Sequence, residues 1–237
     1  MGRVYALADL HGQKQLWKSI KEYLKPDDIL YFLGDAIDRG PDGYEIMKEL
    51  LLDHRVIYIK GNHEQMMEDA LKEIKHYGGQ WFGKALELWG HNDCYPTLEA
   101  WEADGGMYDW IYVLKELPYY KTYINKEGRT IQLSHAGWTP GDFIPTNDMF
   151  LWDRGHFFDK IPEEYVENGW IMIHGHTPNL YLMKELGKDN YEEKNGIVMY
   201  ADGAKIDIDC GCFFTNQISL LNLDTFETIL FKQEGDA

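Results

Sequence analysis

Short polar stretches rich in Asp, His and Asn recur along this sequence, and each follows directly on a run of apolar residues. The stretches are ADLHG (8–12), GDAIDRG (34–40), GNHE (61–64), SHAG (134–137) and HGHT (174–177). One stretch alone could be a turn, since Gly, Pro and Asp supply the conformations that chain reversals need. In open α/β sheets, however, ligands bind at the carboxyl ends of strands. Stretches that repeatedly follow strands therefore predict one shared site.

The side chains in these stretches form a mixed set of oxygen and imidazole donors. The candidate metal ligands are Asp9, His11, Asp35, Asn62, His135 and His176. Such donors suit Mn²⁺, Fe or Zn²⁺, and a shared carboxylate can hold two ions roughly 3.5–4 Å apart. Two such ions would clamp a phosphate and lower the pKa of a bridging water, giving hydroxide for in-line attack on phosphorus. Asp35 would be the bridging carboxylate.

Two of these assignments have alternatives. Asp9 could instead cap the helix that we expect to begin near Gln13. His174 could ligate in place of His176, but the strand alternation after IMI (171–173) also permits a buried structural histidine at 174, so we favour His176. Glu64 is expected to begin a helix, where its charge suits the positive end of the dipole.

The elements that position these residues follow from the hydrophobic pattern. Apolar runs at 3–8, 28–33 and 55–60 alternate with apolar residues at helical spacing, which predicts a βαβαβ unit with parallel strands. Residues 64 to about 117 are mainly helical in pattern, and we interpret them as a helical cap inserted into a single domain of residues 1–237. The tryptophans of this segment, such as Trp89 and Trp101, are expected in its core, while the cap wall and the loop NDCYPT (92–97) could shape the substrate site.

The rest of the chain has mostly strand character. We expect a hairpin around NKEG, buried strands, and a closing antiparallel pair; these are residues 121–134, then 169–173 and 196–201, then 217–223 and 227–231.

Composition limits the partners and the location. With 23 Lys+Arg against 40 Asp+Glu the net charge is −17, which argues against nucleic acid or an anionic membrane as a partner. Any positive charge that meets a phosphate must therefore be local. No apolar run approaches the roughly 20 residues of a membrane span, and the N-terminal residues lack the apolar core of a signal peptide, so we expect a cytoplasmic protein. Three cysteines do not indicate a disulfide framework.

The order of the motifs resembles the calcineurin-like metallophosphoesterases, in particular the phosphoprotein phosphatase branch with its bacterial and phage members. That family's order is GDxHG, GDxVDRG, GNHE, HAG or HGG, and GHT, and it is matched over residues 5–177, with a looser echo at IDIDCG (206–211). The resemblance implies an α/β protein of the metallo-dependent phosphatase fold, a central β-sandwich flanked by helices. It also implies two divalent metal ions, with Mn²⁺ as the first choice and Fe or Zn²⁺ as alternatives.

The resemblance also implies a role for each residue. The first ion would take Asp9, His11 and Asp35, and the second would take Asp35, Asn62, His135 and His176. His63 matches the general acid, which Asp38 would orient and charge. Arg39, and Arg154 in LWDRG, match the arginines that hold phosphate oxygens, although Arg154 could also be a surface ion-pair residue.

The resemblance implies hydrolysis of phosphomonoesters, most simply by a bacterial-type serine/threonine protein phosphatase acting on a phosphorylated protein or a small phosphoester. A symmetrical diadenosine tetraphosphate hydrolase is the alternative, because it shares every motif. A non-catalytic binding scaffold would be expected to lose ligands or the acid, and this chain keeps them. Asp93 and Cys94 stand where bacterial relatives tend to carry a Gly-Gly pair, so the substrate preference stays open, as does the oligomeric state.

Overall fold

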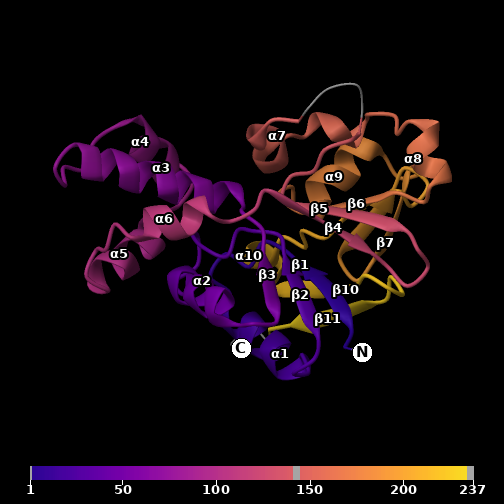
Figure 1. Cartoon of the computed structure of the whole chain (residues 1–237), viewed down its shortest axis with the longest axis horizontal. Coiled ribbons are helices and arrows are strands. Elements are labelled where there is room, and N and C mark those ends of the chain that lie inside the picture. The colour runs from indigo at the N-terminus through magenta and orange to yellow at the C-terminus, as the bar shows by residue number, and fades with distance from the viewer. Residues whose placement is uncertain (1, 141–144, 234–237) are drawn as a thin grey trace.

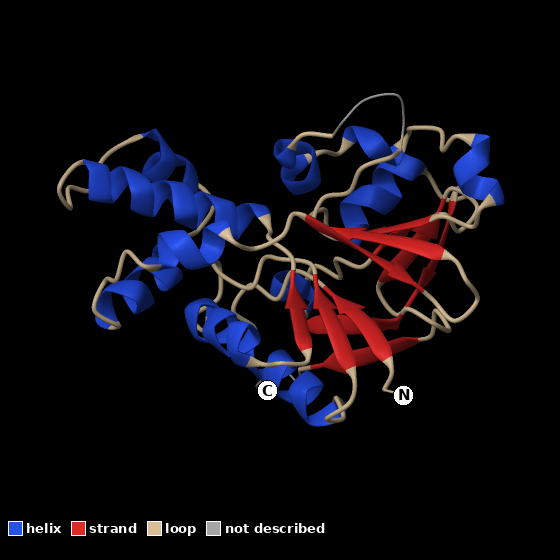
Figure 2. Ribbon diagram, viewed as in Figure 1, coloured by secondary structure: helices blue, strands red, loops and turns tan. Residues whose placement is uncertain are grey.

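The structure is a computed structural model of the chain, in which residues 2–140 and 145–233 are described. Two β-sheets pack face to face, and helices cover their outer surfaces (Figures 1 and 2). This arrangement confirms the predicted α/β class and the central β-sandwich.

The first sheet contains the βαβαβ unit. Its strands, in spatial order, are β11 (Thr228–Lys232), β10 (Gln217–Asn222), β1 (Val4–Leu7), β2 (Ile29–Phe32) and β3 (Val56–Tyr58). β1, β2 and β3 are parallel, whereas β10 runs antiparallel to both β1 and β11. The carboxyl ends of the three parallel strands therefore meet at one edge, as the sequence predicted.

The second sheet combines the predicted hairpin and two predicted buried strands with a short strand that overlaps the stretch IDIDCG (206–211) and with an edge strand, residues 191–194, that the sequence did not indicate. Its order is β4 (Tyr120–Ile124), β5 (Thr130–Ser134), β6 (Ile171–His174), β9 (Lys205–Asp207), β8 (Ile197–Tyr200) and β7 (Tyr191–Lys194). β5, β6 and β9 are parallel to one another. The residues that follow β5 and β6 therefore lie together at one edge of this sheet.

The core explains why these short strands form. Successive side chains of β1 point to opposite faces, so Tyr5 and Leu7 pack against helices while Ala6 and Ala8 pack between the sheets. The layer between the sheets is filled from both sides by small and branched residues, including Leu33 from beyond β2. Burial on both faces is typical of parallel strands and requires their nearly continuous apolar sequences.

The helices fall into three groups. α1 (Lys14–Tyr23) and α2 (Gly43–Leu52) connect the parallel strands of the first sheet. α7 (Asn147–Trp152), the 3₁₀ turn η1 (Gly155–Phe157), α8 (Glu163–Glu167) and α9 (Asn179–Leu186) lie by the second sheet, and the short α10 (Cys212–Thr215) precedes β10. The third group is α3 (Asn62–His76), α4 (Lys84–Gly90), α5 (Tyr95–Ala103) and α6 (Trp110–Lys115).

This third group confirms that residues 64 to about 117 are mainly helical. α4 and α6 pack on α3, α5 packs on α2, and the group extends beyond the sheets on one side (Figure 1). Trp89 and Trp101 are buried, as expected for core tryptophans. None of the described helices is long and apolar enough to cross a membrane.

Candidate active site

The predicted site residues converge where strands of both sheets end. Asp9 follows β1, Asp35 follows β2, and Asn62 and His63 open α3 just beyond β3; His135 follows β5 and His176 follows β6. Most of these side chains are buried, with Asp35 at 2%, His63 at 1% and His135 at 0% exposure. Burial of so many ionisable groups in one place requires pairing or a metal ion.

The backbone turns sharply at these positions. Asp9, His11, Asp35 and His176 all have positive φ, between 41° and 69°, a conformation that costs free energy for residues other than glycine. Neighbouring glycines allow the close approach of the carboxylates. A Cβ atom at Gly61 would lie 2.1 Å from Oδ1 of Asp35. This explains why glycine precedes asparagine in GNHE.

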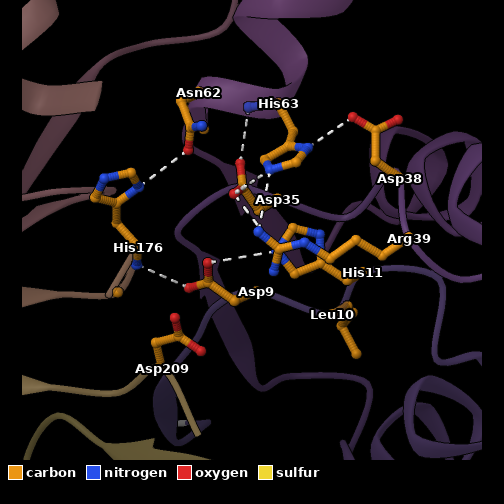
Figure 3. Close-up of polar contacts among 12 residues, drawn as sticks. Asp9, Leu10, His11, Asp35, Asp38, Arg39, Asn62, His63, His176 and Asp209 are labelled. Atoms are coloured by element: carbon orange, nitrogen blue, oxygen red, sulfur yellow. Dashed lines mark hydrogen bonds and ion pairs between the residues drawn. The ribbon is translucent and has the colours of Figure 1, made fainter. Parts of the chain in front are cut away.

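Asp35 lies at the centre of the cluster (Figure 3). Its Oδ2 lies 3.6 Å from Nε2 of His11, 3.7 Å from Nε2 of His63 and 3.4 Å from Nε2 of His135. Its Oδ1 accepts a hydrogen bond from the backbone N–H of His63 at 3.0 Å. Burial alone would raise the pKa of Asp35, but the charges of His135 and His63 outweigh burial and hold it well below its ordinary value. The position of Asp35 is thus compatible with its predicted role as a bridge between two metal ions.

Asn62 links the remaining imidazoles. Its Oδ1 lies 2.7 Å from Nε2 of His135 and 3.1 Å from Nδ1 of His176. His176 also donates its backbone N–H to Oδ2 of Asp9 at 3.1 Å, which ties the second sheet to the first. Asp9 makes this contact instead of capping α1, whose N-cap residue Gln13 has no side-chain cap. The structure therefore does not support Asp9 as the cap of this helix.

The ring nitrogens of His11 and His135 test whether the site fits a cation. Nδ1 of His11 lies 2.9 Å from the carbonyl of Ile37, and Nδ1 of His135 lies 2.7 Å from the carbonyl of Leu33. Each Nδ1 must carry a proton to donate to a carbonyl, so in a neutral ring Nε2 is an acceptor. These Nε2 atoms face Asp35, and that of His135 faces the Asn62 amide. A cation among such acceptors resolves the conflict, as does a proton on Nε2 of His135, because the charge of Asp35 outweighs burial and raises the pKa of that ring. A hydrogen bond from Nδ1 to a carbonyl is typical of metal-binding histidines.

The pKa shifts indicate the same need for positive charge. Burial, followed by the nearby carboxylates of Asp209 and Asp35, raises the pKa of Asp9 well above its ordinary value. Burial also lowers the pKa of His11 and of His176 well below the usual value for histidine. Neutral imidazole is the form that binds metal. Two overlapping groups, His11–Asp35–His63 and Asp9–Asp35–His135, have ligand atoms close enough to share an ion.

His63 is held by a separate set of contacts. Its Nδ1 lies 2.6 Å from Oδ2 of Asp38, and the same oxygen accepts a hydrogen bond from the indole of Trp89 at 2.7 Å. The backbone N–H of Asp38 donates to Oγ1 of Thr97 at 2.8 Å. Burial would lower the pKa of His63, but the carboxylates of Asp35 and Asp38 outweigh burial and raise it above its ordinary value. The His63–Asp38 pair is thus arranged to hold a proton on the ring.

Two arginines line an open cavity beside this cluster. Nη2 of Arg39 lies 3.4 Å from Nε2 of His63, and Nε of Arg154 donates to Oγ1 of Thr177 at 2.9 Å. Both arginines and His176 line one cavity of about 680 Å³. Arg154 is therefore part of the same cavity wall as Arg39. Asp93 is the residue of the loop NDCYPT that lines this cavity, whereas Trp89 and Trp101 are buried.

His174 and His176 occupy different environments. His174 is buried behind the cluster, with Nε2 2.8 Å from the hydroxyl of Tyr200 and Nδ1 3.1 Å from the carbonyl of Gly175. The ring of His176 faces Asn62 instead (Figure 3). This geometry favours His176 as the ligand, and the assignment stays a prediction.

The carboxylate of Glu64 connects the start of α3 to the turn that follows β2. It accepts hydrogen bonds from the backbone N–H groups of Asp35, Ala36 and Gly61 and from the hydroxyl of Tyr58, all at 2.9–3.0 Å. Its bond with the backbone N–H of Gly61, the N-cap residue of α3, is one half of a capping box, since glycine has no side chain to make the other half. The sequence placed Glu64 at a helix start but did not indicate its bonds to the Asp35 turn.

Glu64→Gln is expected to lower the free energy of unfolding by about 1–3 kcal/mol, the cost of leaving a buried donor without an acceptor. Urea unfolding measures this change. Glu163→Gln, which alters an exposed carboxylate in the first turn of α8, is the matched control. Equal stability of the two variants would contradict the role of Glu64.

Three residues that support the site were not predicted from the sequence. Trp89 and Thr97 both bond to Asp38, and Asp209 is buried beside Asp9 (Figure 3). Burial raises the pKa of Asp209 to about 6. The only signal for Asp209 was the stretch IDIDCG, and nothing in the sequence pairs Trp89 or Thr97 with Asp38.

Comparison with known proteins agrees with this geometry. Residues 2–207 match the calcineurin-like phosphoesterase family. Serine/threonine-protein phosphatase 1 of Salmonella typhimurium is 36% identical over 87 residues, which cover 33% of this chain and 40% of that protein. The symmetrical bis(5′-nucleosyl)-tetraphosphatase of Pseudomonas putida strain F1 is 28% identical over 145 residues, which cover 58% of this chain and 44% of that protein.

The matched regions span less than half the length of these two relatives. The crystal structure of a metallophosphoesterase from Sphaerobacter thermophilus has the same fold, with a TM-score of 0.55, 13% identity, and coverage of 98% of this chain and 88% of that one. Because the family match extends over most of the sequence, and its motif residues converge on one buried cluster, the chain belongs to the calcineurin-like phosphoesterase family of hydrolytic enzymes.

Proposed function

We propose that this protein hydrolyses phosphomonoesters with the help of two divalent metal ions and that it acts as a serine/threonine protein phosphatase. One observation carries the proposal: Oδ2 of Asp35 lies 3.6 Å from Nε2 of His11 and 3.4 Å from Nε2 of His135, and Asp35 belongs to two groups of potential ligands, one with each of these histidines. A carboxylate so placed can serve two ions at once.

The motifs that this chain shares with the family propose which residues would hold the ions. Asp9, His11 and Asp35 would hold one ion, and Asp35, Asn62, His135 and His176 would hold the other. Mn²⁺ is our first choice, because oxygen and imidazole donors are mixed, with Fe and Zn²⁺ as alternatives. Divalent ions would supply positive charge for the phosphoryl oxygens and would lower the pKa of a water, so that hydroxide is available to attack phosphorus.

Side chains of this protein would orient the phosphoryl group and protonate the leaving group. Arg39 and Arg154 would orient the phosphoryl group from the cavity wall through their paired N–H donors. His63 would donate its proton to the leaving oxygen, since Asp38 holds Nδ1 and leaves Nε2 facing the cavity side near Arg39. We also propose that α3–α6 form a cap within one domain, because Trp89 and Thr97 of this segment fix Asp38.

Removal of metal is expected to abolish turnover. Treatment with a chelator should reduce hydrolysis of an aryl phosphate to background, and added Mn²⁺ should restore it. Full turnover by protein that elemental analysis shows to be free of divalent metal would contradict the proposal.

Charge favours a monoester over a dinucleoside polyphosphate. The cavity offers Arg39 and Arg154 as its two charged bases among the described residues, and Asp93 and Glu185 line it as well. Two arginines suffice for one phosphoryl group, whereas a tetraphosphate chain carries several negative charges that the two carboxylates repel.

The substrate class is tested by one panel. We expect kcat/KM for phosphoserine or phosphothreonine peptides to exceed that for diadenosine tetraphosphate, with phosphotyrosine peptides and phenyl phosphate measured beside them. The symmetrical tetraphosphatase is kept as the second candidate because a relative carries that name. A higher kcat/KM for the dinucleotide than for every phosphopeptide would promote it.

A further inference from the structure

The cavity beside the arginines has a second feature that phosphate binding does not require. Phe158, Tyr181 and Phe214 line it, and these side chains are 65%, 63% and 68% exposed. Single exposed aromatic residues are ordinary, but several that gather in one hollow mark an interaction surface. These three residues come from the loop after η1, from α9 and from α10. We call the surface that they form with Arg39, Arg154, Asp93 and Glu185 the aromatic groove.

Opposite charges lie at the two ends of the α9 wall of the aromatic groove, with Arg154 at its start and Glu185 near its end. Arg154 bonds to Thr177 at the start of the α9 wall, beside His176. Tyr181 and Glu185 lie one turn apart on the same helix, so they share the face that lines the groove. From Pro178 to Glu185 the rise is roughly 10 Å at 1.5 Å per residue. That is the span of about three residues of extended peptide.

A buried lysine keeps the wall in place before any substrate binds. Lys205 is 0% exposed, and its Nζ donates to the carbonyls of His156 and of Asp159, the latter at 2.8 Å. These carbonyls flank Phe157 and Phe158, a pair that begins three residues after Arg154. The aromatic groove is therefore a preformed surface on this side, which reduces the entropy lost on binding.

We propose that the aromatic groove recognises the sequence around the phosphorylated residue: a basic side chain about three positions away, attracted by Glu185, with apolar or aromatic side chains between them. This inference rests on the proposed function and names its substrate class more closely. Charge complementarity favours a peptide substrate over a dinucleotide substrate. The arginines fit one phosphoryl group and the carboxylate of Glu185 fits a cation, while Glu185 and Asp93, whose backbone carbonyl accepts a hydrogen bond from the N–H of Arg39, repel further phosphates.

The test uses the full chain loaded with Mn²⁺ and phosphothreonine peptides that differ at one position. Peptides carry Arg or Glu three residues before or after the phosphothreonine, with Leu or Gly between. The better Arg peptide is expected to exceed its Glu counterpart in kcat/KM by roughly 2- to 30-fold, because the exchange replaces an attraction with a repulsion. The peptide with Leu is expected to have a higher kcat/KM than the peptide with Gly. Phe214→Ala is expected to reduce this difference, mainly through KM.

Glu185→Lys is expected to reverse the charge preference, whereas Glu22→Lys, an exposed site on α1, is expected to retain the wild-type ratio. Turnover of phenyl phosphate, which is too small to reach Glu185, reports the proposed function separately. Metal-dependent turnover of phenyl phosphate with equal rates for Arg and Glu peptides would overturn this inference and leave the proposed function standing. If no phosphoester is hydrolysed, both fail. A dinucleoside tetraphosphate that outperforms every peptide would also overturn the inference.

Discussion

Asp35→Asn is expected to remove most of the activity and to weaken both proposed metal sites together. The amide keeps the size of the side chain but loses the negative charge that would serve both ions. Loss of an outer-shell partner alone typically costs 10–100-fold in metal affinity, and we expect loss of a shared ligand to cost more. Elemental analysis after gel filtration should find fewer than two ions per chain, with kcat/KM reduced in parallel.

The matched control for this change is Asp27→Asn, which alters an exposed carboxylate in the turn before β2. It is expected to keep the wild-type metal content. Two ions bound by Asp35→Asn with wild-type affinity would refute the bridge.

His63→Gln is expected to keep the metal ions but to lose roughly 10²–10⁴-fold in kcat on alkyl phosphates, the usual effect of removing a general acid. The loss should be smaller for an activated aryl phosphate, because such a leaving group departs without much protonation. Parallel kinetics on a phosphoserine peptide and on p-nitrophenyl phosphate measure the difference.

His54→Gln, at an exposed site after α2, is the control and is expected to behave as wild type. An equal loss on both substrates would mean that His63 does not protonate the leaving group. The contact of Nδ1 with Asp38 at 2.6 Å would then hold the ring for another purpose.

The framework of the site could be predicted because its strands have clear sequences. β1, β2, β3 and β6 are short apolar runs that end in a polar turn, and the antiparallel β10 and β11 flank a turn. By contrast, β7 has the sequence YEEK and lies at the edge of the sheet, paired with β8, and no hydrophobic pattern marks it. β9 has three residues, Lys205–Asp207, which is too short for a period to be recognised.

The same limit explains what was missed in the site. Asp209 reaches Asp9 because the short β9 pairs in parallel with β6, a long-range contact that local pattern does not reveal. The indole of Trp89 could be assigned to the core from its residue type, but its hydrogen bond to Asp38 depends on how α4 packs on α3. Glu64 illustrates the intermediate case, since its helix start was predictable and its contacts with the Asp35 turn were not.

In the proposed site, two divalent ions share Asp35. Crystals of the full chain grown with Mn²⁺ and measured at a wavelength where manganese scatters anomalously test it most directly. We expect two anomalous peaks roughly 3.5–4 Å apart, one beside Asp9 and His11, the other beside Asn62, His135 and His176, with the Asp35 carboxylate between them. A single peak, or two peaks of which only one contacts Asp35, would contradict this arrangement.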